Sequence, residues 1–81
     1  FLTNQLQNPS QLSAGDLRLT MPRFYPENFF HNLQLLEPLQ KIAHKLGAST
    51  TQISLAWLLA KASHIIPIPG TTNPQHCEEN F

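Results

Sequence analysis

Residues 64–69, HIIPIP, constrain the fold more than any other feature, because they are typical of a buried strand with no partner in the chain. The three isoleucines are β-branched, and the run is short and apolar, as in a parallel strand covered on both faces. The two prolines cannot donate to a strand ladder, so we expect irregular pairing where the strand ends. A strand of this kind needs neighbouring strands and covering helices. The sequence therefore predicts an α/β protein to which this chain contributes one core strand, at about 64–68.

Two helices are predicted before this strand, at 26–47 and 49–62. The first has a broad apolar face, and Gly47 suits the position just after a helix C-terminus. Pro38 interrupts the first helix, because it lacks a backbone donor and crowds the preceding turn. We therefore expect a kink or a break near Glu37.

The second helix opens with a capping-box pattern, in which Ser49 is followed three residues later by Gln52. It is so apolar that it needs more than one neighbour to cover it. An N-cap asparagine followed by proline predicts the start of a further helix over 73–81. Residues 1–25 show no sustained periodicity and are interpreted as a long loop.

Composition narrows the possible functions of the chain. Its 81 residues are 41% hydrophobic and 12% charged, with five basic and five acidic residues and a net charge of zero. No basic cluster exists, so we expect neither nucleic acid nor a membrane surface as a partner. No apolar run approaches the roughly 20 residues of a membrane span, and no spacing of ligands predicts a metal site. The single cysteine, Cys77, excludes an internal disulfide and fits the cytoplasm.

Residues 70–74, GTTNP, follow directly on the predicted strand and open the last predicted helix. Glycine lets the backbone approach a ligand closely. The first N–H groups of a helix have no partner within it and favour an anion such as phosphate, and the two threonines add hydroxyl donors. The stretch is compatible with an anion site without a fixed cation, although the residues alone favour an ordinary helix cap.

Residues 53–80, ISLAWLLAKASHIIPIPGTTNPQHCEEN, closely resemble the C-terminal signature of the aldo-keto reductases. The Phe1-Leu2-Thr3 stretch resembles the tail of the GFLTG segment in that family. The DLR and PRF motifs within 16–24, and the helical stretch after them, are similar to the segment that follows. The resemblance covers nearly all of the chain, and the IPGT and EEN motifs are its specific part.

This resemblance implies a (β/α)8 TIM barrel, of which the chain would be the mostly helical C-terminal fragment. Residues 1–25 would then be the loop after strand seven, 64–69 would be strand eight, and 73–81 would begin the cofactor-binding helix. The chain starts with phenylalanine rather than methionine and stops soon after a glutamate pair, so we expect both ends to be cuts. The fragment should need the rest of the barrel to fold.

The activity that the resemblance implies is reduction of small-molecule aldehydes and ketones by hydride transfer from NADPH. In the family, a tyrosine donates the proton and works with an aspartate, a lysine and a histidine on earlier strands. No catalytic residue is therefore expected in this chain, and the isolated fragment should be inactive. Tyr25, the only tyrosine, lies in the irregular segment and is not expected to be the proton donor.

The resemblance also assigns the cofactor contacts. The residue matching Thr71 binds the phosphate on the adenosine ribose, and those matching Glu79 and Asn80 bind the adenine edge. The predicted NADP-binding set is Gly70, Thr71, Thr72, His76, Glu79 and Asn80. The family often has an arginine or lysine around these positions, whereas this chain has only His76, so NAD is not excluded.

A second hypothesis treats the chain as a small helical interaction module without catalysis. It would present the leucine and phenylalanine faces of residues 29–59 to a partner helix. A truncated, inactive remnant of an enzyme would carry the same sequence.

Overall fold

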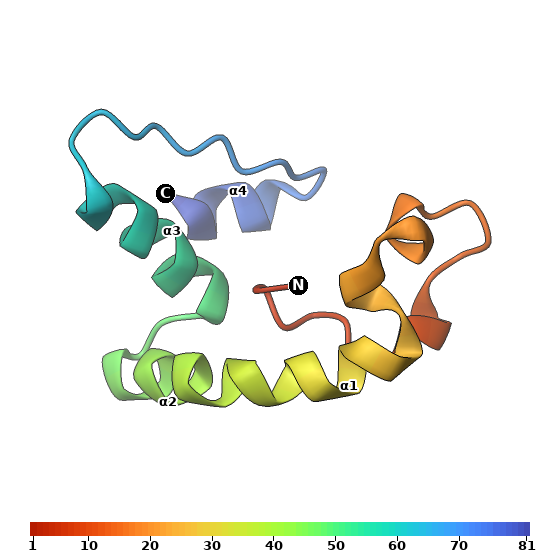
Figure 1. The fold of residues 1–81 in the computed structure, drawn as a ribbon. Coiled ribbons are helices and arrows are strands. Elements are labelled where there is room, and N and C mark those ends of the chain that lie inside the picture. The colour runs from red at the N-terminus through yellow and green to blue at the C-terminus, as the bar shows by residue number, and fades with distance from the viewer.

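The computed structural model describes residues 1–81 as an arc of helices and one long open connection (Figure 1). Helices α1 (Pro26–Leu33) and α2 (Glu37–Leu46) follow one another along the base of the arc. Helix α3 (Thr50–Lys61) turns away from the end of α2, and α4 (Pro74–Asn80) lies beside α3. The segment 1–25 holds three short 3-10 turns, at Pro9–Gln11, Leu17–Thr20 and Pro22–Phe24. The N-terminus lies inside the arc.

The core strand predicted at 64–68 is absent from this structure. Residues 65–71 have no regular secondary structure, and the Ile65 N–H, which donates to the Ala62 carbonyl at 3.2 Å, makes the only backbone–backbone bond there. The side chains of Ile66 and Ile68 are 82% and 91% exposed. A strand is held by ladder bonds to neighbouring strands, and the chain contains no second strand. Local sequence therefore leaves the segment extended but unpaired.

Pro38 breaks the helix predicted over 26–47 where its chemistry requires. A 3-10 turn at Gln34–Leu36 separates α1 from α2. In a regular helix the residue at position 38 donates to the carbonyl of Gln34, but proline has no N–H to give. The N–H of Glu37 donates to that carbonyl instead, and so closes the tighter turn.

The junction between α2 and α3 is fixed by two local capping motifs. Gly47 has φ of +63°, a left-handed conformation that favours glycine, and it ends α2. The Ala48 N–H donates to the Ala43 carbonyl at 3.0 Å, as in a Schellman motif. Ser49 and Gln52 then form the capping box that begins α3.

The core is small and lies on one face of α1 and α2. Phe29, Leu36 and Ala43, each seven residues after the last, are buried, and Phe24 packs against Phe29 with ring centroids 6.2 Å apart. The Phe1 ring meets Phe29 edge-on at 6.0 Å. Aromatic stacking therefore joins the N-terminal segment to the first long helix.

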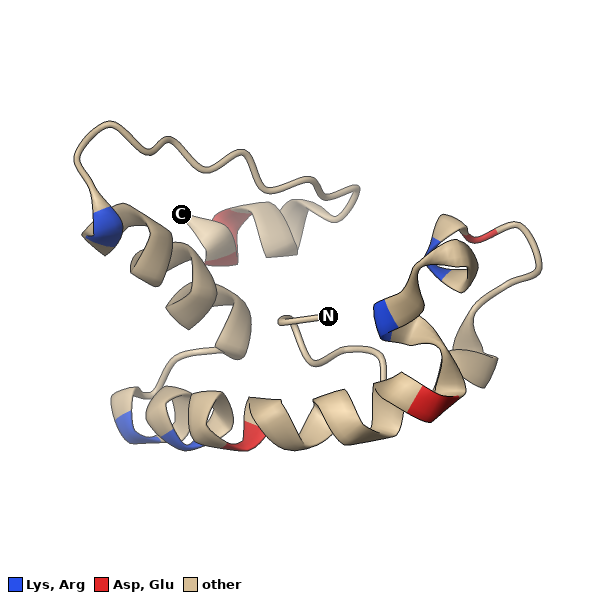
Figure 2. Ribbon diagram, in the orientation of Figure 1, with Lys and Arg blue, Asp and Glu red and all other residues tan.

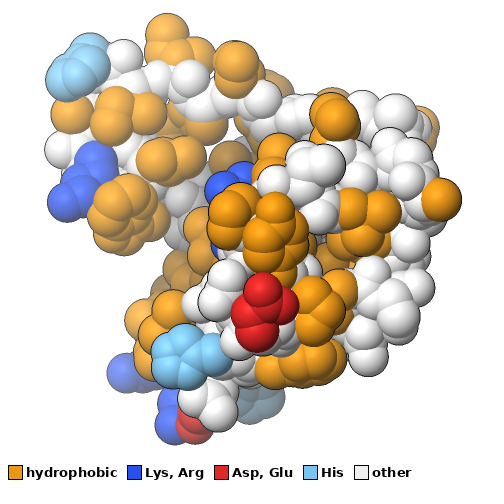
Figure 3. Space-filling model, turned by 45° about the vertical axis from the view of Figure 1, so that its right-hand side comes forward, with side chains coloured by type: hydrophobic (Ala, Val, Ile, Leu, Met, Phe, Trp, Pro, Cys, Tyr) orange, Lys and Arg blue, Asp and Glu red, His pale blue; other side chains and the backbone are white.

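Most of the remaining apolar surface is uncovered. Figure 3 shows hydrophobic side chains spread over both arms of the visible face. On α3, where no residue is buried, Trp57 and Leu59 are 59% and 57% exposed. Leu35, in the 3-10 turn before α2, and Leu46, at the end of α2, are also exposed. So many exposed large apolar side chains are unusual for a free-standing monomer of this size.

Candidate functional site

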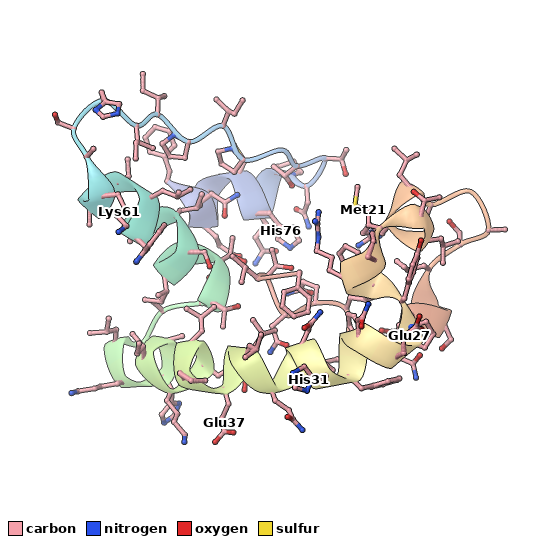
Figure 4. All side chains as sticks on the ribbon, in the orientation of Figure 1. Met21, Glu27, His31, Glu37, Lys61 and His76 are labelled. Atoms are coloured by element: carbon pink, nitrogen blue, oxygen red, sulfur yellow. The ribbon has the colours of Figure 1, made fainter.

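A polar groove of about 370 Å³ lies between the N-terminal segment, α3 and α4. Its walls come from three parts of the chain that are distant in sequence, and only two of its lining residues are apolar leucines. The lining residues are Leu2, Thr3, Gln5, Ser49, Thr51, Ser54, Leu55, Pro69, Gly70, Thr71, His76, Glu79 and Asn80. The groove thus brings together five of the six predicted site residues and leaves Thr72 outside its lining. Figure 4 shows His76 extending from α4 toward the middle of the arc.

The turn before α4 is held by its own side chains. The Thr71 hydroxyl accepts from the Asn73 N–H at 3.1 Å and lies 3.4 Å from the Asn73 carbonyl oxygen. The Asn73 side chain in turn accepts from the Gln75 N–H at 2.9 Å, as an N-cap. The N-cap therefore already uses one of the amides that the sequence offered to an anion. The Thr71 hydroxyl, with only one long bond to a carbonyl, is the donor most easily turned toward a ligand.

A single side-chain hydrogen bond joins helix α4 to α3. The Nε2 of Gln52 donates to the carbonyl oxygen of Glu79 at 2.7 Å. Within α4, the Nε2 of Gln75 donates to a carboxylate oxygen of Glu79 at 3.2 Å. The two contacts hold the backbone and the carboxylate of Glu79 separately.

The far wall of the groove is connected to α3 in a similar way. The Thr50 hydroxyl donates to the carbonyl oxygen of Thr3 at 3.1 Å, across 47 residues of sequence. This bond places the N-terminal segment opposite Glu79 and Asn80, with which Thr3 shares the groove.

The groove contains no lysine or arginine. His76 and Glu79 are its only titratable lining residues, and no lysine or arginine follows Lys61 (Figure 2). Arg18 is already paired with Asp16, whose carboxylate accepts from its Nη2 at 2.6 Å and its Nε at 3.0 Å. That hydrogen bonding lowers the pKa of Asp16 to about 2, so the two side chains stay paired at neutral pH. An anion in this groove would be met by neutral donors and one imidazole.

A second cavity of about 370 Å³ adjoins the groove and is mainly apolar. It lies between α3, the open connection and α4, and its lining includes Leu55, Leu59, Pro67, Cys77 and Asn80. The Cys77 thiol is free and exposed. Asn80 therefore separates a polar space from an apolar one and, unlike the other predicted site residues, is half-buried.

The structure has neither a metal-binding cluster nor a membrane-spanning helix. No three His, Cys, Asp or Glu side chains come close enough to hold a metal ion. None of the helices combines the length and the apolar character needed to cross a membrane.

The aldo/keto reductase family model matches residues 2–81, almost the whole chain. The chain belongs to the aldo/keto reductase family. Membership implies a TIM barrel, and within residues 1–81 this family member contributes helices and no strand.

Three curated relatives are each much longer than this aldo/keto reductase chain. It is 44% identical over 81 residues to the aldo-keto reductase yakc [NADP(+)] of Schizosaccharomyces pombe, covering 100% of this chain and 24% of that protein. It is 39% identical over 80 residues to the aldo-keto reductase str7 of Strobilurus tenacellus, covering 99% and 24%. An aldo-keto reductase of Gibberella moniliformis is 33% identical over 75 residues, covering 93% and 22%. The chain spans about a quarter of the length of these relatives. No solved structure matches it significantly.

Sequence reasoning about this aldo/keto reductase missed the opposite wall of the groove. Thr3, Gln5 and Ser49 line it, yet nothing in their local sequence marks them as site residues. Ser49 and Gln52 were interpreted only as a capping box. The sequence does leave the Gln52 amide nitrogen available for a further partner, because the box itself uses only the side-chain oxygen, but Gln52 lies outside the lining.

Proposed function

We propose that these residues form the C-terminal part of an NADPH-dependent oxidoreductase that reduces aldehydes or ketones. In this proposal the polar groove binds the adenosine-phosphate end of NADP(H). The observation that carries it is the convergence of Gly70, Thr71, His76, Glu79 and Asn80 on one groove, in a chain of the aldo/keto reductase family. The name of the Schizosaccharomyces pombe relative includes NADP(+), which supports this cofactor over NAD.

The residues present fit this end of the cofactor. The volume of the groove lies within the usual range for small-molecule sites, which is roughly 300–1,000 Å³. Thr71 and His76 can donate to the ribose phosphate, and the Glu79 carboxylate can accept from the exocyclic amine of adenine. Asn80 offers a paired donor and acceptor beside the apolar cavity, which suits the edge of a flat base.

The reacting groups lie outside this chain in our proposal. When bound, the nicotinamide supplies the hydride to the substrate carbonyl carbon, while residues 1–81 hold only the opposite end. The hydroxyl of Tyr25, the sole tyrosine, donates a hydrogen bond to the Thr20 carbonyl oxygen at 3.3 Å, and Tyr25 does not line the groove. We assign catalysis to the rest of the barrel.

The rest of the barrel also accounts for the uncovered surface. Neighbouring strands would pair with residues 64–68, and they would cover the exposed isoleucines and the apolar face of α3. We propose that the segment needs these neighbours for its stable fold. The free thiol of Cys77 fits a reducing compartment, and we place the enzyme in the cytoplasm.

Calorimetric titration of the full-length protein with NADPH and with NADH tests the proposal. We expect binding of NADPH, and oxidation of bound NADPH when an aldehyde or ketone is added. A full-length, folded protein that binds neither cofactor would contradict the proposed function.

The variant His76→Arg should strengthen NADPH binding. A guanidinium at this position would add a charge-assisted bond to the ribose phosphate, where the natural groove offers an imidazole. We expect a gain in NADPH affinity of roughly three- to tenfold, as a partly exposed bond of this type gives. NADH, which lacks that phosphate, serves as the control and should bind within twofold of the wild-type affinity. An equal gain for both cofactors would place His76 away from the phosphate.

A further inference from the structure

We infer that Gln52 is a positioning residue that sets the backbone of Glu79 and Asn80 for the adenine end of the cofactor. This inference rests on the proposed function and adds to it a residue outside the groove lining. Its basis is that one side-chain amide caps the start of α3 with its oxygen and reaches α4 with its nitrogen.

The Gln52 amide has its two ends engaged by groups of opposite kind. Its Oε1 accepts from the Ser49 N–H at 3.0 Å, as the capping box requires. Its Nε2 donates to the Glu79 carbonyl oxygen at 2.7 Å. A flipped amide would face donor with donor and acceptor with acceptor, so the two partners together fix its orientation.

The accepting carbonyl has a special place in α4. Glu79 lies in the last turn, where carbonyl groups have no partner within the helix. That carbonyl also belongs to the peptide plane that joins Glu79 to Asn80, the two residues assigned to adenine. A hydrogen bond to it therefore orients both side chains at once, and it ties them to α3 rather than to the short helix alone.

The bridge also explains why a helix of this length can be a precise support. α4 has two turns of helix, and an isolated helix shorter than roughly 12 residues is marginal. Its residues are exposed apart from the half-buried Asn80, so little packing holds it in place. Among the side-chain hydrogen bonds of the structure, the one from Gln52 alone joins α4 to another helix.

The variant Gln52→Glu separates the two tasks of the side chain. Glutamate keeps the oxygen that completes the capping box, but it has no N–H to give to the Glu79 carbonyl. In the full-length protein we expect a melting temperature within about 2 °C of wild type, since the start of α3 is preserved. We expect weaker binding of NADPH by roughly three- to tenfold, the range for one lost hydrogen bond. KM for the cofactor should rise while kcat at saturation stays the same.

Two controls exclude other causes. Ala56→Gly weakens α3 without touching the Gln52 amide, so it should lower the melting temperature and leave cofactor affinity unchanged. NADH reports on charge, because a carboxylate that repelled the ribose phosphate would weaken NADPH alone. Adenine positioning requires equal losses for NADPH and NADH.

In the cofactor-free Gln52→Glu variant, the amides of residues 79–81 should also exchange with solvent faster than in wild type.

The outcomes distinguish this inference from the proposed function. Unchanged affinity and unchanged exchange in Gln52→Glu, with wild type still binding NADPH, would overturn the positioning role only. A loss confined to NADPH would also overturn it and would assign the effect to charge. Absence of NADPH binding by the wild-type protein would remove the proposed function, although faster exchange at residues 79–81 would still show the bridge between α3 and α4.

Discussion

Replacing Thr71, Glu79 and Asn80 together by alanine in the full-length protein should weaken NADPH binding by roughly a hundredfold. The variant removes a hydroxyl donor, a carboxylate acceptor and an amide from the same groove. Lost hydrogen bonds of about 1 kcal/mol each, and more for the charged group, sum to about 3 kcal/mol, which corresponds to roughly that factor. Calorimetric titration measures the change, and melting temperature checks that the protein remains folded.

The matched control for this variant is Glu78→Ala. It removes one carboxylate from the same helix, but Glu78 does not line the groove. We expect its affinity for NADPH to stay within twofold of wild type. A triple variant that bound NADPH as tightly as wild type would place the adenosine end of the cofactor elsewhere.

Phe29→Ala should destabilise the protein by about 4 kcal/mol, the range for an aromatic side chain removed from a packed core. Phe29 is fully buried, and its ring centroid lies about 6 Å from those of Phe1, Phe24 and Phe30. Its loss leaves a cavity in the aromatic cluster through which the N-terminal segment packs against α1. Urea unfolding of the full-length protein measures the change in the free energy of unfolding.

Phe30→Ala is the matched control, with the same chemistry at the next position. The Phe30 side chain is 50% exposed, so we expect about half the loss seen at Phe29. A loss at Phe30 equal to or larger than that at Phe29 would contradict the packing described for α1.

Local chemistry made the helix boundaries predictable. The Ser49–Gln52 capping box, the left-handed Gly47 and the break before Pro38 each depend on residues within four positions of one another. The core strand predicted at 64–68 is not confirmed in this chain, for the opposite reason. Apolar, β-branched residues favour a strand only when neighbours supply the ladder, and those neighbours are not among residues 1–81.

The same distinction between local and long-range contacts applies to the candidate site. Gly70 through Asn80 are near in sequence, so one turn and one short helix bring them to the groove. The other wall, with Thr3 and Ser49, depends on contacts across tens of residues, such as the bond from Thr50 to Thr3. No pattern in a single sequence marks such pairs. Thr72 shows the limit even within the turn, since it lies beside Thr71 and yet outside the lining.

The open connection at 65–71 has a consequence for how a complete barrel would close. Apart from the Ile65 N–H, its backbone groups make no backbone–backbone hydrogen bond, and its dihedral angles are not held by any ladder. Fixing a residue's backbone costs about 1–2 kcal/mol in entropy, and the ladder bonds that offset this form only on docking. In a complete barrel we therefore expect closure at this seam to be cooperative, because its stability would come from the strands on both sides.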